Sequence, residues 1–417
     1  GTIDLGVSGG SGVGYAWAVT TNASSTATID GDGLYRAGST GSVADVVTVS
    51  DSLGNTATAT ITVTAGLTAT PPSANVPPRG SVDLDVSGGS NAGFAWSFVA
   101  NNSGGSLNVG TGQYTAGSVG SRTDTVRATD SLGNTVDVQI TVGPGVSVTP
   151  ASPATPPNGT IAFGATGGSG AGFAWSLLEN NSGATIDPET GAYKAGATGN
   201  VLDTVRVQDS LGNVAVVNVS VGGGLAINPA APSTPPRGSL DLDVSGGSGT
   251  GFAWSMVSSA SGGAIATSTG VYQAGSTGDV TDTVRVTDSL GNTATIDITV
   301  TAPLAIQPLG ATLAPLGTIE LEATGGSGSG LVWSFATNSS GATLVPETGV
   351  YHAGPTGGVT DTILVTDSLG NTATINVTVT TSLTIAPETA SVPPRGSHAF
   401  TASGGAGGYA FTLTNNG

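Results

Sequence analysis

All five tryptophans of this chain are separated by one constant interval. They are Trp17, Trp96, Trp175, Trp254 and Trp333, at steps of 79 residues. Five tyrosines keep the same step, at Tyr35, Tyr114, Tyr193, Tyr272 and Tyr351. So do five Asp-Ser-Leu-Gly-Asn runs, which begin at Asp51, Asp130, Asp209, Asp288 and Asp367. A fixed period of this size indicates tandem copies of one small module. It constrains the fold more strongly than any other feature of the sequence.

The period predicts six segments. Their boundaries are 1–65, 66–144, 145–223, 224–302, 303–381 and 382–417. Gly1 aligns with Gly80, so the first copy lacks its opening strand, and the last is the N-terminal fragment of a divergent copy. A module of this length buries only about 60 to 65% of its unfolded surface, so each copy gains stability from its neighbours.

Composition excludes several functions. The formal net charge is −18 and only 9% of residues are charged, whereas nucleic acid and anionic membranes attract a basic face. The chain contains no cysteine, so we expect neither disulfides nor thiol chemistry. No apolar run is long enough for a membrane span. The abundance of Gly, Thr, Ser, Val and Ala with a single lysine favours an exported bacterial surface protein.

One copy, residues 66–144, indicates the fold class. Val82, Leu84 and Val86 alternate with Asp83 and Asp85, which is typical of a half-buried strand. A turn is predicted at 77–80, where glycine would relieve the corner that two prolines impose. Further strands are expected at 67–71, 93–99, 124–130 and 135–142, with two short ones on either side of 111–112. Six or seven short strands per copy and no helical period predict an all-β sandwich, with the recurring tryptophan and tyrosine in its core.

Three of these features together resemble a known family. They are the tryptophan on the third strand, the Tyr-Thr-Ala-Gly segment at 114–117 and the Val-Arg-Val-Thr-Asp-Ser-Leu-Gly-Asn hairpin at 284–292. This combination resembles the bacterial immunoglobulin-like (Ig-like) and cadherin-like tandem repeats of surface adhesins, stalks and extracellular fibres. The resemblance implies a spacer or adhesive rod whose ligand binding is delegated to a distal domain. Some relatives use calcium or lysine crosslinks, but Lys194 cannot crosslink five modules, and the junctions lack the Asp-rich linkers of cadherins.

The polar candidates favour structural roles, and we expect no catalytic residue, metal site or cofactor. Each hairpin aspartate has a second aspartate six residues before it, and on a strand the two would lie about 20 Å apart. Paired-carboxylate catalysis needs about 5 to 9.5 Å, so each aspartate is interpreted as an acceptor for loop N–H groups. The stretch at 30–33 resembles a calcium loop but occurs once and lacks the distal glutamate. His352 and His398 have no partner pattern.

One pattern suggests a contact between modules. The same turn position holds Arg79, Arg237 and Arg395 in alternate copies and Asn158 and Leu316 between them. We hypothesise that Arg79 reaches the loop that starts at Asp209, and Arg237 the loop that starts at Asp367. The alternative is an arginine exposed in a turn, since a surface ion pair contributes at most about 1 kcal/mol.

The sequence therefore favours a non-enzymatic, stiff structural segment of a long bacterial extracellular fibre, stalk or adhesin. Its expected partners are neighbouring repeats and lateral copies of itself. The alternative is an array of Ig-like modules that binds glycan or protein, which would need exposed aromatics at one repeated loop position. Donor-strand polymerisation would fill the gap in the first copy, but residues 396–417 would then duplicate residues 1–22. This duplication favours the interpretation that the sequence is one part of a longer array of repeats.

Overall fold

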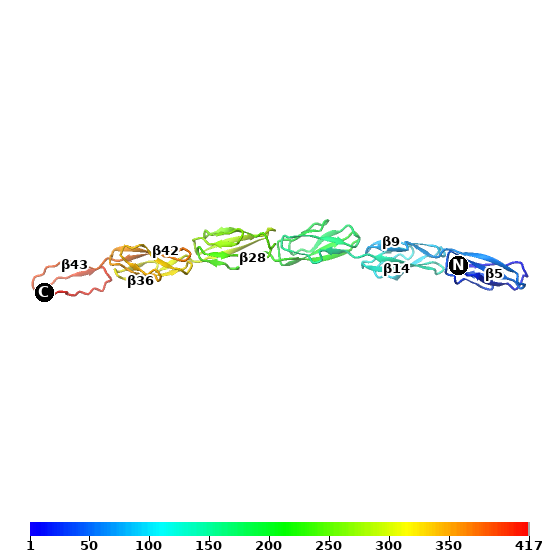
Figure 1. The fold of residues 1–417 in the computed structure, drawn as a ribbon, viewed down its shortest axis with the longest axis horizontal. Coiled ribbons are helices and arrows are strands. Elements are labelled where there is room, and N and C mark those ends of the chain that lie inside the picture. The colour runs from blue at the N-terminus through cyan, green and yellow to red at the C-terminus, as the bar shows by residue number, and fades with distance from the viewer. Residues whose placement is uncertain (416–417) are drawn as a thin grey trace. The chain divides into compact units, whose positions relative to one another are not determined.

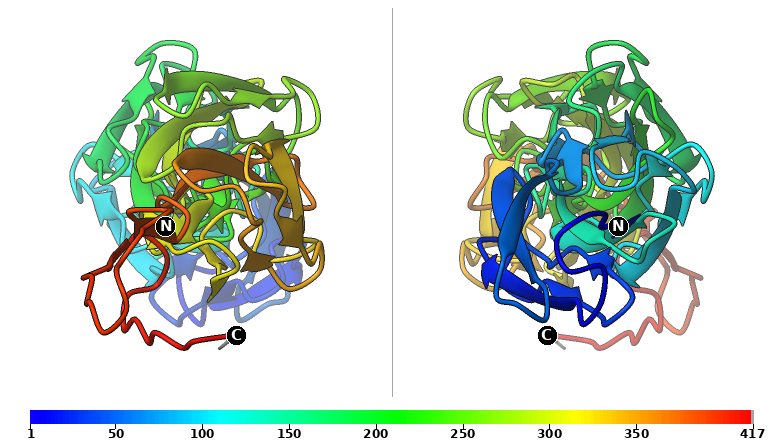
Figure 2. Two further views of the ribbon diagram at one scale, coloured as in Figure 1. Left: turned by 90° about the vertical axis from the view of Figure 1, so that its left-hand side faces the viewer. Right: turned by 90° about the vertical axis from the view of Figure 1, so that its right-hand side faces the viewer.

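The computed structural model describes residues 1–415, which consist of β-strands and loops without a helix (Figures 1 and 2). This confirms the all-β class and its repeated units of about 79 residues. No helix long and apolar enough to cross a membrane occurs among the described residues. Contacts between residues divide the chain into two compact units. The first comprises Gly1–Thr155 and Thr160–Val221, and the second comprises Pro156–Gly159 and the chain from Gly222 onward.

The first unit contains strands β1 to β24. The strands of residues 1–65 are β1 (Thr2–Asp4), β2 (Ala16–Thr21), β3 (Thr28–Ile29), β4 (Leu34–Arg36), β5 (Val43–Ser50) and β6 (Thr56–Val63). Those of residues 66–144 are β7 (Thr68–Thr70), β8 (Ser73–Val76), β9 (Ser81–Asp83), β10 (Asp85–Ser87), β11 (Ala95–Ala100), β12 (Ser106–Leu107), β13 (Gln113–Thr115), β14 (Arg122–Thr129) and β15 (Thr135–Val142). Then follow β16 (Ser147–Thr149), β17 (Ala154–Thr155), β18 (Thr160–Ala162), β19 (Gly164–Thr166), β20 (Ala174–Glu179), β21 (Thr185–Ile186), β22 (Ala192–Lys194), β23 (Val201–Gln208) and β24 (Val214–Val221).

The second unit contains strands β25 to β44. Residues 224–302 form β25 (Ala226–Asn228), β26 (Ser233–Thr234), β27 (Ser239–Asp241), β28 (Asp243–Ser245), β29 (Ala253–Ser259), β30 (Ala264–Ile265), β31 (Val271–Gln273), β32 (Val280–Thr287) and β33 (Thr293–Val300). Residues 303–381 form β34 (Ala305–Gln307), β35 (Ala311–Leu313), β36 (Thr318–Glu320), β37 (Glu322–Thr324), β38 (Val332–Thr337), β39 (Thr343–Leu344), β40 (Val350–His352), β41 (Val359–Thr366) and β42 (Thr372–Val379). The last segment has β43 (Thr384–Ala386) and β44 (Thr401–Ser403). Each strand lies inside one expected segment; the exact segment boundaries stay a prediction.

Each complete segment is a sandwich of two β layers. In residues 66–144 one layer is the four-stranded sheet β11-β14-β15-β8, in which β8 pairs parallel to β15. The other layer combines the sheets β12-β13-β9 and β10-β7. The chain passes from β7 in one layer to β8 in the other at a cis Thr70–Pro71 bond, and four further copies have a cis bond at the matching proline.

Two strands differ from the sequence expectation, so the second segment has nine strands instead of six or seven. The predicted strand at 81–86 is split at Leu84, whose N–H donates to Gly112 O of the opposite loop at 3.2 Å. Strand β8 was not predicted. It lies between two proline groups, and its short Ser-Ala-Asn-Val stretch has no strong alternation.

The recurring aromatics lie in the cores. All five tyrosines have side chains no more than 1% exposed, and Trp96, Trp175, Trp254 and Trp333 are 2–5% exposed. Each ring therefore contributes a large buried apolar area to a small module. Trp17 differs, because it is only partly buried against the core of the first segment.

The turn at 77–80 corrects one detail of the prediction. Arg79 adopts the left-handed conformation, with φ of 63°, and the residues at its repeat position do the same: Asn158, Arg237, Leu316 and Arg395. Gly80 is instead required by contact, since a Cβ there would lie 2.7 Å from Pro77 Cδ and 3.0 Å from Pro77 O. The corner thus places strain on a non-glycine residue, which costs on the order of 1 kcal/mol or more.

We predict that Leu242→Ala destabilises the fourth segment by about 2–5 kcal/mol, since this side chain is 2% exposed and its loss opens a core cavity. Hydrogen exchange of peptides from residues 224–302 measures the effect. The matched control is Leu5→Ala, at the same repeat position but only half-buried, where we expect a smaller loss. Equal losses at the two sites would contradict the difference in packing.

Candidate functional site

The hairpin loop at residues 209–213 is organised by its first residue. The Asp209 carboxylate accepts four hydrogen bonds, from the N–H groups of Ser169 (2.6 Å), Leu211 (2.9 Å) and Asn213 (2.8 Å) and from Asn213 Nδ2 (2.8 Å). The same set recurs at Asp51, Asp130, Asp288 and Asp367. The loop is therefore a rigid structure closed by its own side chains.

These hydrogen bonds change the titration of the loop aspartates. Burial acts to raise the pKa of Asp209, but the hydrogen bonds from Asn213, Ser169 and Leu211 outweigh it and lower this pKa to about 2. The pKa of Asp367 is lowered to about 2 for the same reasons. The carboxylates thus stay charged well below neutral pH and hold the loops closed.

The second aspartate of each pair forms a buried polar cluster with a serine and the recurring tyrosine. In the fourth segment Asp282 Oδ2 accepts hydrogen bonds from Ser261 Oγ and Tyr272 Oη, both at 2.6 Å. Burial acts to raise the pKa of Asp282, yet these hydrogen bonds lower it overall. Burial, the hydrogen bond to Asp282 and, to a smaller extent, the charge of Asp282 raise the pKa of Tyr272 to about 12. The tyrosine therefore stays a neutral donor and the aspartate a charged acceptor.

The hairpin loop also contacts the turn of a preceding segment in the first unit. Asn213 Nδ2 donates to Pro78 O at 3.0 Å, across 135 residues of sequence. Asn213 is only 7% exposed, and Leu211 beside it is 38% exposed. One asparagine amide thus bonds its own loop through Asp209 and another module through a backbone carbonyl.

The second unit repeats this contact twice. Asn371 Nδ2 donates to Pro236 O, and Asn292 Nδ2 donates to Pro157 O, both at 3.0 Å. Asn158 Nδ2 also donates to Asn292 Oδ1 at 2.7 Å. Like Asn213, Asn292 and Asn371 are buried, at 8% and 7% exposed. We call the asparagine and proline of each such pair a latch.

Two hairpin loops have no latch among the described residues. These are the loops at 51–55 and 130–134, in which Asn55 and Asn134 are exposed. Leu53 and Leu132 are 79% and 58% exposed, against 38–39% for Leu211, Leu290 and Leu369. The leucines of the three latched loops are thus less exposed than those of the other two.

The hypothesised arginine contacts lie at the same junctions. A Cβ on Gly212 would be 3.9 Å from Arg79 Nη1, and one on Gly370 would be 4.0 Å from Arg237 Nη1. Each guanidinium thus lies beside a hairpin glycine, and no ion pair with Asp209 or Asp367 occurs within residues 1–415. The ion pair found in this range joins Arg127 to Asp137. Stiffening of alternate junctions by these arginines stays a proposal.

The remaining polar candidates lie apart from the junctions. Asp30 Oδ1 accepts the N–H groups of Asp32 and Leu34 at 3.1 and 2.9 Å, as in an ordinary turn. His352 Nδ1 lies 2.8 Å from Thr318 Oγ1, and the ring of His398 lies against Phe400. Within the described part of the chain, no three His, Cys, Asp or Glu side chains gather as a metal site would require.

Comparison with known proteins identifies no family. No family model and no curated protein sequence matches the chain. Among solved structures, the human desmocollin-1 ectodomain matches at 12% identity and TM-score 0.22, over 88% of this chain and 92% of its own. The I9–I11 tandem of titin matches at 13% identity and TM-score 0.29, over 57% and 100%. The N-terminal eight Ig domains of the Down syndrome cell adhesion molecule match at 12% identity and TM-score 0.21, over 87% and 64%.

The class of the protein follows from its own architecture. The repeated two-layer sandwiches define the chain as a tandem array of Ig-like β-sandwich domains. Sequence reasoning missed the junction residues Asn213, Asn292 and Asn371 and the buried serines of the polar clusters. Both sets were detectable, because the serines at 24, 103, 182, 261 and 340 and the hairpin asparagines keep the period of 79. The sequence did connect this turn with this hairpin, through Arg79 and the loop at Asp209, but it gave no reason to pair the asparagine amide with a proline carbonyl.

We predict that Tyr272→Phe destabilises the fourth segment by about 1.5–3 kcal/mol, because it removes a donor to a buried carboxylate. The stabilisation is fully present below the ordinary tyrosine pKa of about 10 and is lost in the wild type as pH rises through about 12. Chemical denaturation monitored by hydrogen exchange tests this. Tyr15→Phe, which removes an exposed hydroxyl bonded to Gly9 O, is the control and should change stability by less than about 0.5 kcal/mol.

Acid is expected to weaken the hairpin loops. Since the pKa of Asp209 is about 2, below its ordinary value of about 3.9, its stabilisation is present above pH 5 and is lost as pH falls through 2. Asp209→Asn should therefore cost about 1–3 kcal/mol at pH 7. The gap between variant and wild type should close below about pH 2. A gap that stays constant from pH 7 to pH 2 would show that charge is not responsible.

Proposed function

We propose that this chain is a non-catalytic, stiff spacer segment of a long bacterial extracellular fibre, stalk or adhesin, built to extend and to present. The observation that carries the proposal is the latch, which joins successive modules within each unit, Asn213 to Pro78 in the first and Asn371 to Pro236 in the second. The same amide and the same kind of acceptor recur at Asn292 and Pro157 of the second unit. A backbone carbonyl is the acceptor each time, so the joint keeps its geometry while the surrounding side chains vary.

The short linkers support the same function. Between β15 and β16 only residues 143–146 intervene, and their backbone is bonded on both sides. Gly143 N–H donates to Val76 O at 2.9 Å in the preceding module, and Pro144 O accepts from Gly168 N–H at 3.0 Å in the following one. A linker held in this way has little freedom to bend, so the latch and the linker restrain the junction at two separate points.

The position of the aromatics favours a spacer over an array of glycan-binding sites. A repeated glycan site needs aromatic faces exposed at one loop position. The recurring tyrosines are at most 1% exposed, and the tryptophans of the four complete modules are at most 5% exposed. The recurring aromatic residues thus stabilise the cores of the modules.

We predict that Asn213→Ala loosens the junction between the second and third modules. Because the chain has no cysteine, the substitutions Thr123→Cys and Leu202→Cys introduce the only two thiols that a spin label can modify. Both sites are exposed and occupy matching repeat positions. Pulsed electron paramagnetic resonance should give a narrow distance distribution for the otherwise unchanged chain and a distribution at least about twofold broader for the variant.

The control is Asn55→Ala. Asn55 Nδ2 donates to Asp51 at 2.9 Å, as Asn213 does to Asp209, but Asn55 forms no latch within the described residues. This variant loses the same loop hydrogen bond and should leave the distribution between residues 123 and 202 unchanged. A broad distribution in the labelled parent chain would refute the stiff spacer.

A further inference from the structure

The four complete modules differ in the length of one ladder. In each of them the second short strand pairs parallel to the last strand, as β8 does with β15. This ladder has four residue pairs in residues 66–144 and three in residues 303–381. It has only two pairs in residues 145–223 and two in residues 224–302. The ladder of the first short strand does not vary, since β7 with β10 and its three equivalents each have three pairs.

Proline shortens the ladder in the third and fourth modules. Pro153 and Pro232 stand where the other two modules have Ala74 and Ala311. The carbonyl of Pro153 faces the last strand, since it accepts from Ser220 N–H at 3.0 Å, and the equivalent bond of the fourth module is 3.1 Å long. In an extended strand the N–H and C=O groups of one residue point to the same side, so an alanine here would also donate to the last strand. Proline has no N–H to donate, and the ladder begins only at the residue after it.

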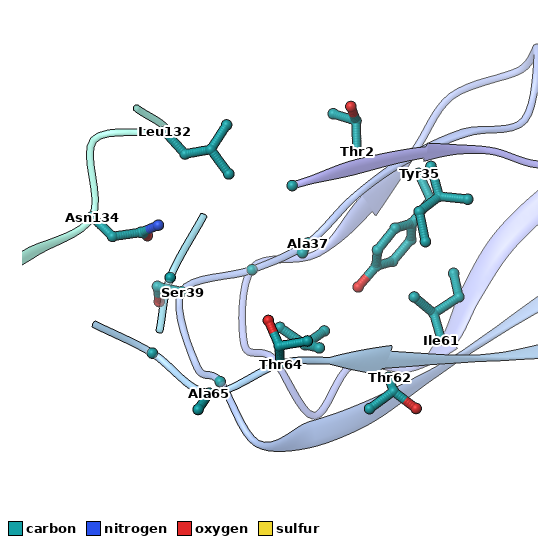
Figure 3. Close-up of a pocket in the computed structure, with 17 residues that line it drawn as sticks. Thr2, Tyr35, Ala37, Ser39, Ile61, Thr62, Thr64, Ala65, Leu132 and Asn134 are labelled. Carbon is teal, nitrogen blue, oxygen red and sulfur yellow. The ribbon is translucent and has the colours of Figure 1, made fainter. Parts of the chain in front are cut away.

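The second short strand also covers the edge of the last strand. In the four complete modules the final valine of the last strand is at most 1% exposed: Val142, Val221, Val300 and Val379. Figure 3 shows the same edge in residues 1–65, where Ile61, Thr62 and Thr64 line a pocket and Val63 is only half-buried. Rupture of the ladder in a complete module therefore exposes its apolar core as well as its last strand.

A pull along the chain loads this ladder in shear. The chain enters a module through its two short strands and leaves it through its last strand, so tension draws β8 and β15 in opposite directions. Since the two strands are parallel, the pulled residues are Ser73 and Val142, at opposite ends of the ladder. All pairs of the ladder therefore resist together, and a longer ladder resists a larger force.

The ladder with the last strand is also the better anchored of the two. β15 pairs with β14 over eight residue pairs, and the last strands of the other complete modules are paired to the same extent. β7, in contrast, pairs with β10 in a sheet of only two strands. The β7 ladder therefore yields first in every module, and the ladder with the last strand decides the force at which the module unfolds.

We propose that the array has a graded resistance to tension, in which the third and fourth modules unfold before the second and the fifth. The inference rests on the function proposed above, because a fibre or stalk segment carries tension along its chain. The two modules with proline-shortened ladders then lengthen the chain at a load that the other two still withstand. Their unfolding limits the force that reaches the other modules and whatever the segment presents.

The test holds the 417-residue chain at constant force by handles at its two ends and records each unfolding step. A complete module has 79 residues, so its step should be roughly 240 Å long, and the shorter segments 1–65 and 382–417 give smaller steps. We expect four such steps in two kinetic phases, two fast and two slow. The rates of the phases should differ at least about fivefold, because each slow module has at least one further ladder pair.

Two reciprocal substitutions assign the phases to modules. Pro153→Ala restores the N–H donor of the third module and should leave one fast and three slow steps. Ala74→Pro removes that donor from the second module and should give three fast steps and one slow step. The fold accepts a proline at this position, because the third and fourth modules already contain it.

The matched control is Asn75→Pro, which moves the same ring by one residue. Gly143 N–H donates to Val76 O at 2.9 Å, so the backbone groups of Val76 face the last strand and those of Asn75 face away from it. β8 is the edge strand of its sheet, so a proline whose missing N–H faces away removes no ladder bond. This variant should keep two fast and two slow steps.

Equilibrium stability distinguishes a mechanical effect from a general one. Pro153→Ala adds a ladder bond to the folded module but also gives the unfolded chain more freedom, and the two effects oppose each other. Hydrogen exchange of peptides from residues 145–223 without force should therefore change less than about threefold. The unfolding rate of the same module under force should fall at least about fivefold, since it depends on the bonds that break first.

Three results would overturn the proposal: four steps with one common rate, phases that Pro153→Ala leaves unchanged, or a response to Asn75→Pro that equals the response to Ala74→Pro. The stiff spacer and the graded resistance fail separately. Modules of equal resistance can still be joined stiffly, with a narrow distance distribution between residues 123 and 202. A junction that flexes can still connect modules that unfold at different loads.

Discussion

The parallel ladder between the second short strand and the last strand of each of the four complete modules is the constraint on which the rest depends. In the second module β8 lies along β15, which completes the four-stranded sheet and brings the Pro77–Gly80 turn beside the end of β15, at the border with the next module. The linker begins at the same place, since Gly143 N–H donates to Val76 O. One ladder therefore closes the core, positions the acceptor of the latch and fixes the start of the next module.

The two aspartates of each module explain how so small a sandwich holds its loops without disulfides. They lie at opposite ends of one strand, and each satisfies several donors that would otherwise be buried without partners. Asp282 joins a serine and a tyrosine inside the module, while Asp288 closes the hairpin that faces its neighbour. A charged acceptor makes each hydrogen bond stronger than a neutral one. The module thus replaces covalent crosslinks with two polar clusters of fixed composition.

The sequence predicted the fold better than the junctions, for a physical reason. The period, the alternation in strands such as β15 and the burial of the aromatics are local signals, and they led to the correct fold class. Strand β8 had no such signal, because four residues between prolines show little alternation and their partner is 66 residues away in sequence. The sequence led us to expect the turn and the hairpin to meet through Arg79, but it did not reveal the latch itself. Asn213 and Pro78 are individually ordinary turn residues, and only the three-dimensional order of modules makes them partners.

The residue beside each latch varies while the latch itself does not. Beside the three latches this position holds Arg79, Asn158 and Arg237, all in the left-handed conformation. A side chain that carried the junction could not vary in this way without changing its geometry. The acceptor is instead the backbone carbonyl of a proline, which is present whatever side chain follows it. Side-chain chemistry is then free to differ from one junction to the next, as the Asn158–Asn292 pair and the Arg79 contact with Gly212 illustrate. An array built on a backbone acceptor can diverge in sequence and still join its modules in one way.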